Sequence, residues 1–172
     1  DLLETMGVAY RGLGLYDDAE RLVEASLNRR RGLLGDDHPD TLRTFKSLGT
    51  VYWRQGRYDD AAKAHRRAWE GGRRVLGETH EDVLSSANNL GMARWRLGRY
   101  DEASELQEAN LGRIREALGE ENDLAQATMN NLAGVYWTMG RYGDAGDLYR
   151  EAAEIGERVL GPDHDKTMNA GN

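Results

Sequence analysis

Four histidines are the residues that first suggest chemistry, because an imidazole can act as a general base or bind a metal ion. Three of them, His38, His80 and His164, stand at multiples of one fixed interval. A repeating fold would place them in equivalent turns, apart from one another, whereas a metal site needs convergent ligands. His65 stands alone, and we interpret it as a satisfied core or boundary histidine. The sequence therefore predicts no metal site.

Nucleophilic and acid–base catalysis find equally little support. The chain has no cysteine, which excludes thiolate nucleophiles, zinc–thiolate sites and disulfides together. Its 30 acidic residues fall mostly in turns and along exposed helix positions, and no pair of carboxylates is forced into a cleft. No nucleophile elbow, phosphate-binding loop or His-Glu-x-x-His motif occurs. We expect no enzyme activity and no cofactor.

The composition also argues against some classes of binding partner. The formal net charge of −7 argues against nucleic acid, since counterion release needs a basic face. No apolar run approaches the roughly 20 residues that cross a bilayer, and the first residues lack a signal-peptide pattern. We therefore expect neither membrane insertion nor targeting, with the cytoplasm as the default location.

A repeat accounts for nearly every residue. The motif Tyr-Asp-Asp-Ala, or a close variant, starts at 16, 58, 100 and 142, and Leu-Gly recurs at 34, 76, 118 and 160, so the period is 42 without insertions. Within one unit, Phe45, Leu48, Gly49 and Tyr52 have the spacing of a buried helix face, which we name helix A. Helix A should end at Gly56, and Ala61, Ala64, His65 and Ala68 form the buried stripe of the next helix, helix B, which should start at Asp59 or Asp60.

The start of helix A has its own signal. His38 precedes Pro39 and Asp40, so the histidine or the acid before it can cap the helix, the proline suits the first helical position, and Asp40 meets the helix dipole. A repeated turn explains this histidine better than chemistry does.

These positions resemble the tetratricopeptide repeat consensus, in which a Leu-Gly-x-x-Tyr stretch of helix A meets an alanine of helix B. The long period, Leu-Gly-Asp-Asp-His-Pro-Asp-Thr at 34–41 and Asn-Asn-Leu-Gly at 88–91 are similar to the kinesin-light-chain-like subgroup, which is also widespread in bacterial regulators. The resemblance implies an all-α fold, a right-handed α-solenoid of tandem antiparallel helix pairs. We expect a single array with units of about 1–35, 36–77, 78–119 and 120–161 and the start of a fifth helix at 162–172, truncated at both ends.

In this family the A helices line a concave groove that binds peptides. Carried onto this sequence, the groove residues are Arg43, Lys46, Thr50, Trp53, Arg54, Ser85, Asn88, Met92, Trp95, Arg96, Asn130 and Trp137. The row Trp53, Trp95 and Trp137 has two interpretations, packing between repeats or an aromatic ladder for apolar ligand side chains. Asparagines at 88 and 130 would bind a peptide backbone, as the resemblance implies, because an amide donates and accepts together.

The predicted function is a protein–protein interaction scaffold that binds an extended peptide or partner segment in the concave groove, as part of a larger regulatory protein of bacterial type. Arg43, Lys46, Arg54 and Arg96 would make the groove locally basic, which favours an acidic peptide with apolar side chains, although solvated surface arginines explain them equally well. The alternative is a structural or self-assembly element that braces a larger complex as a homo-oligomer. Trp69 on helix B is the candidate contact for that role.

Overall fold

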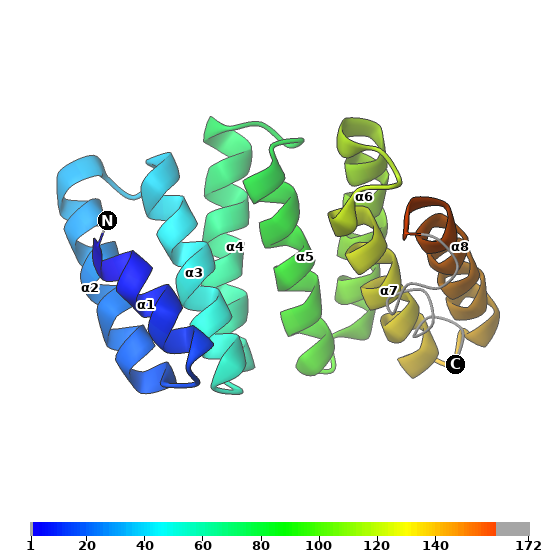
Figure 1. The fold of residues 1–172 in the computed structure, drawn as a ribbon, viewed down its shortest axis with the longest axis horizontal. Coiled ribbons are helices and arrows are strands. Elements are labelled where there is room, and N and C mark those ends of the chain that lie inside the picture. Colours follow the sequence, from blue (N-terminus) through cyan, green and yellow to red (C-terminus); the bar gives the residue numbers. More distant parts are fainter. Residues whose placement is uncertain (1, 161–172) are drawn as a thin grey trace. The chain divides into compact units, whose positions relative to one another are not determined.

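The computed structural model describes residues 2–160, which fold into two units, one that ends at Leu97 and one that starts at Gly98. All secondary structure within the described residues is helical. The first unit holds α1 (Leu2–Gly12), α2 (Tyr16–Leu34), α3 (Pro39–Arg54), α4 (Tyr58–Val75) and α5 (Glu81–Arg96), and the second holds α6 (Tyr100–Leu118), α7 (Asp123–Thr138) and α8 (Tyr142–Leu160). Figure 1 shows these helices running back and forth within each unit.

Within that part of the chain, seven glycines at even spacing from Gly14 to Gly140 have positive φ angles between 76° and 91° and mark the ends of helices. This left-handed conformation is open to glycine at little cost and lets the chain reverse sharply. After α3, the amide of Arg57 donates to the Tyr52 carbonyl at 2.9 Å and that of Gly56 to the Trp53 carbonyl at 3.0 Å. The glycine spacing is half the repeat, so each helix from α1 to α7 ends beside one of them.

Each helix packs on its neighbours in sequence within its unit, and the A helices of the first unit, α1, α3 and α5, also touch one another in order. The prediction of an all-α fold of helix pairs is confirmed. The B helices start at the tyrosine, which in α4 lies one residue before Asp59 and two before Asp60, and both expected aspartates occupy the first turn of α4. Acidic side chains there stabilise the positive end of the helix dipole. The predicted fifth helix lies outside the described residues.

Between α1, α2 and α3 the core contains Ala19, Val23, Leu27, Leu48 and Val51, with tyrosine and phenylalanine side chains packed against it. Two glycines of the A helices lie very close to helix B. A Cβ added at Gly49 would lie 2.7 Å from the imidazole of His65, and one added at Gly7 would lie 2.6 Å from a methyl group of Val23. Helices A and B therefore meet where helix A has no side chain to hold them apart.

Candidate peptide-binding surface

The A helices that carry the predicted groove, α3, α5 and α7, each begin at a side-chain cap. Nδ1 of His38 accepts a hydrogen bond from the Asp40 amide at 3.1 Å, and Nδ1 of His80 accepts one from the Asp82 amide at 3.2 Å. Asn122, at the same register, caps α7 through its side-chain oxygen at 2.8 Å from the amide of Leu124. The interpretation of these histidines as turn residues is thus confirmed for His38 and His80. His164 lies outside the described residues.

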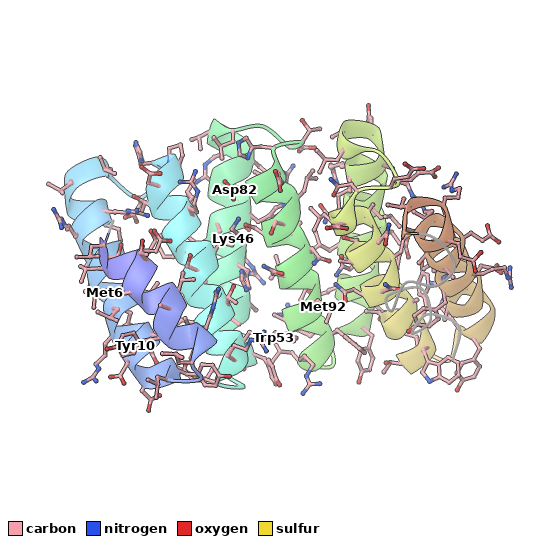
Figure 2. All side chains as sticks on the ribbon, viewed as in Figure 1. Met6, Tyr10, Lys46, Trp53, Asp82 and Met92 are labelled. Atoms are coloured by element: carbon pink, nitrogen blue, oxygen red, sulfur yellow. The ribbon has the colours of Figure 1, made fainter. Side chains whose placement is uncertain are left out.

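Two of the predicted basic groove residues have an acidic partner. The ammonium of Lys46 on α3 forms an ion pair with Asp82 on α5, and the guanidinium of Arg43 lies 3.6 Å from Asp82 and 2.7 Å from Asp40. Although partial burial acts to raise it, the pKa of Asp82 is held below its ordinary value by the hydrogen bond and charge of Lys46, with help from Arg43 and His80. Figure 2 places Asp82 near the N-terminal end of α5 and Lys46 near the middle of α3. The surface around Asp82 is therefore less basic than the sequence suggests.

Two tryptophans of the A helices each pack against a tyrosine of their own repeat, and their role as an aromatic ladder stays a prediction. Trp53 packs edge-on against Tyr58 with ring centroids 5.1 Å apart, and Trp137 packs edge-on against Tyr142 at 4.9 Å. Arg96 of α5 covers the first of these pairs, donating to the Tyr58 hydroxyl at 2.8 Å with its guanidinium 4.9 Å from the ring centroid. Trp53 and Trp95 are half-buried, whereas Trp137 is 60% exposed. Trp53 and Trp137 thus each pack against one tyrosine and keep part of the ring exposed to solvent.

The other predicted residues of the first unit lie on α3 and α5. Thr50, Ser85 and Met92 are half-buried, and the Thr50 hydroxyl donates to the backbone carbonyl of Lys46 at 3.1 Å. Figure 2 shows Met92 and Trp53 toward the C-terminal ends of α5 and α3. Arg54 is exposed and has no ion pair among the described residues.

The two asparagines of the predicted set differ in exposure. Asn130 on α7 is exposed, but Asn88 on α5 keeps only 8% of its surface. At the same register Glu4 of α1 accepts from Arg30 at 2.6 Å and from the Ser47 hydroxyl at 2.8 Å. In the first unit, the side chains at this register, Glu4, Lys46 and Asn88, are engaged in contacts inside the protein. Asn130 is therefore the better candidate for contact with a peptide backbone.

A cluster of three residues recurs at two repeat interfaces and was missed at the sequence level. The Tyr52 hydroxyl donates to Glu24 at 3.0 Å, and the guanidinium of Arg57 lies 4.3 Å from the centre of the Tyr52 ring. The equivalent residues Tyr136, Glu108 and Arg141 repeat the arrangement, with distances of 2.5 Å and 3.8 Å. Burial and the glutamate raise the pKa of both tyrosines to about 12. The available signal was a tyrosine, a glutamate and an arginine that recur together at fixed places of the repeat.

His65 is buried as predicted, but its hydrogen bonding is not satisfied. The side chain is 2% exposed, and Nδ1 has no hydrogen-bond partner. Burial, with a smaller contribution from the charge of Lys46, lowers the pKa of His65 to about 4. The imidazole is thus neutral at neutral pH, and its role is to fill the space opposite Gly49.

Comparisons with known proteins agree with this architecture. The tetratricopeptide repeat family matches residues 1–71, 83–123 and 126–165. The chain belongs to the tetratricopeptide repeat family. Its members generally mediate protein–protein interactions and are typically scaffolds without enzyme activity. No curated protein matches the chain.

Solved tetratricopeptide repeat structures resemble the chain in fold. A putative kinesin light chain from Podosopora anserina is 23% identical, with a TM-score of 0.80, over 91% of this chain and 74% of its own. BtubC (BKLC) from P. vanneervenii is 22% identical, with a TM-score of 0.85, over 98% and 67%. The apo form of RapI is 15% identical, with a TM-score of 0.80, over 91% and 55%. At these identities the likeness concerns the fold alone.

Among residues 2–160, no group of three or more histidines and carboxylates is arranged to hold a metal ion. In the same part of the chain, every helix is too short or too polar to span a bilayer.

Proposed function

We propose that this tetratricopeptide repeat chain holds an extended peptide or partner segment against its A helices, as the binding part of a larger regulatory protein. The observation that carries the proposal is the state of the tryptophans at the C-terminal ends of those helices. Trp53 and Trp137 are each fixed by one tyrosine and keep exposed ring surface. A rigid, partly exposed aromatic ring supplies much binding area at little cost in conformational entropy.

The contacts also indicate the ligand. Because Arg43 and Lys46 share Asp82, the positive charges without an acidic partner in the predicted set are Arg54 and Arg96, among the described residues. Both lie at the ends of helices that carry a tryptophan, Trp53 on α3 and Trp95 on α5. We infer an apolar segment with a carboxylate beside it, which is less acidic than the ligand that the sequence predicted.

A selection from a library of random peptides tests the proposal without knowledge of the natural partner. Peptides enriched on the wild-type chain are measured by fluorescence anisotropy against Trp53→Ala and Trp137→Ala. Loss of an aromatic anchor should weaken binding about tenfold or more. Trp69→Ala is the matched control, since Trp69 lies on the B helix α4 with Arg73 5.0 Å from its ring centre. If all three substitutions weakened binding equally, the peptide would not bind specifically to the A helices, and the proposal would be wrong.

Self-association remains the second candidate, and a specific observation favours it. Met6 on α1 is 38% exposed and Leu13, just after that helix, is 74% exposed, at the register where Leu48 and Gln55 contact α2. Light scattering over a range of concentrations separates the two functions. A monomer of constant mass would exclude self-assembly of this chain, whereas a mass that rises with concentration and falls in a Leu13→Ser variant would support it.

A further inference from the structure

One interface in the first unit replaces the Tyr–Glu–Arg cluster with a pair of arginines. Helix B of one repeat meets helix A of the next at α2–α3, α4–α5 and α6–α7. The first and third interfaces hold the tyrosine–glutamate hydrogen bonds of Tyr52 and Tyr136. At α4–α5 the same register holds Arg66 in place of the glutamate and Arg94 in place of the tyrosine. Two like charges therefore stand where a donor and a carboxylate stand elsewhere.

Arg66 is the member of this pair whose charge is not compensated. Its Nε is buried without a hydrogen-bond partner, and the side chain forms no ion pair within residues 2–160. A partly buried guanidinium without a carboxylate is costly, and a neighbouring positive charge adds to the cost. Arg94 has interactions of its own, but these leave the Arg66 guanidinium without an acid.

The other basic residues of α4 differ from Arg66 in this respect. Its other arginines and its lysine each have an acidic partner: Arg67 and Arg74 contact Asp37 at 2.7 Å and 3.0 Å, Lys63 contacts Asp60, and Arg73 pairs with Glu78. The chain as a whole has an excess of acid. A shortage of carboxylates does not explain why Arg66 lacks one.

We propose that Arg66, with Arg94 beside it, binds an oxyanion of a partner molecule, a carboxylate or a phosphate group. Guanidinium groups suit this ligand because their planar forks donate two parallel hydrogen bonds to one anionic group. The oxyanion takes the place that Glu24 and Glu108 hold at the equivalent interfaces. The site includes a residue of helix B and none of the predicted groove residues, so it stands or falls independently of the proposed function.

Inorganic phosphate and glutarate, each compared with chloride at equal ionic strength, are the probes on the full 172-residue chain. The readouts are the unfolding midpoint and the NMR resonance of the Arg66 Nε–H group. We expect either anion to raise the midpoint and shift that resonance, and Arg66→Ala to weaken the apparent affinity about tenfold. Arg29→Ala should leave the affinity unchanged, since Arg29 is an exposed arginine on the B helix α2 without an ion pair among the described residues.

A double substitution, Arg66→Glu with Arg94→Tyr, rebuilds the tyrosine–glutamate pair of the other two interfaces. It should raise the midpoint in chloride and remove the response to both anions. A response to phosphate alone assigns the ligand to a phosphorylated group, and a response to glutarate alone assigns it to an acidic side chain. The proposal is overturned if neither anion acts, or if Arg66→Ala responds as the wild type does. Arg66→Ala alone tests whether Arg66 binds the anion, even if the double variant does not fold.

Discussion

Substitution of Gly49 by alanine tests the packing that holds helices A and B together. The new Cβ would lie 2.7 Å from Cε1 and 2.8 Å from both nitrogens of the His65 ring. Ordinary contact needs about 3.5 Å, so the ring must withdraw by about 0.7 Å. Because His65 is almost fully buried between its neighbours, that movement shifts the helices rather than the side chain alone.

The expected cost follows from two opposing effects. Overpacking of a core costs about 1–3 kcal/mol, and replacing a helical glycine by alanine returns up to about 1 kcal/mol. The two effects leave a net cost of about 0–3 kcal/mol, and we expect Gly49→Ala to destabilise the protein by about the middle of that range, roughly 1–2 kcal/mol, measured by urea unfolding. Gly112→Ala on α6 is the control, since a Cβ there meets nothing within 4 Å, and it should stabilise by up to about 1 kcal/mol.

A double-mutant cycle with His65→Ala assigns the cause. If the ring is the obstacle, Gly49→Ala should cost less in the His65→Ala background than in the wild type, with a coupling of about 1 kcal/mol or more. The reasoning is refuted if Gly49→Ala is as harmless as Gly112→Ala, or if its cost is the same in both backgrounds.

Three further predictions follow from single contacts. The unfolded chain binds a proton at His65 below pH 6.5, whereas the native chain does so only below about pH 4, so stability should fall by up to about 3 kcal/mol between these values. His65→Val should remove that slope in urea unfolding at stepwise pH. Glu4→Ala should cost about 2 kcal/mol in thermal unfolding, because it leaves Arg30 mostly buried without its carboxylate. Tyr52→Phe should cost about 1 kcal/mol by losing its hydrogen bond to a glutamate, while Tyr10→Phe should cost nothing, since no described residue bonds the Tyr10 hydroxyl.

Each of the three has an outcome that would count against it. A pH slope that survives in His65→Val would place the titrating group elsewhere. An effect of Glu4→Ala no larger than that of Asp18→Ala, which breaks an exposed ion pair with Arg21, would mean that burial adds nothing to the first pair. Equal costs at the two tyrosines would assign the effect to ring packing.

The sequence predicted the features that repeat in register. The helix pairs, the helix-ending glycines and the caps His38 and His80 depend on local chemistry that the copies share, and the structure confirms them. Whether Lys46 faces a peptide or an acid depends on how far α5 stands from α3, which no local pattern contains. The different exposure of Asn88 and Asn130 likewise arises from packing. The roles of the predicted groove residues in binding stay predictions.

The missed Tyr–Glu–Arg cluster illustrates the same limit. Its members lie on three segments, and Glu24 and Tyr52 are 28 residues apart. Alignment of the repeats brings equivalent residues together but does not pair residues at different registers. Only the distance between helices shows that these two side chains meet.

Site-specific photo-cross-linking tests the central claim, that a peptide lies against the A helices, most directly. A photoreactive amino acid is placed at Thr50 on α3 in one sample and at Lys63 on α4 in the other, with a peptide selected on the wild-type chain. Both positions leave the core intact, because Thr50 is half-buried and Lys63 is exposed. The account predicts a cross-link from position 50 and none from position 63. Cross-linking from position 63 alone would contradict it and place the ligand on the B helices.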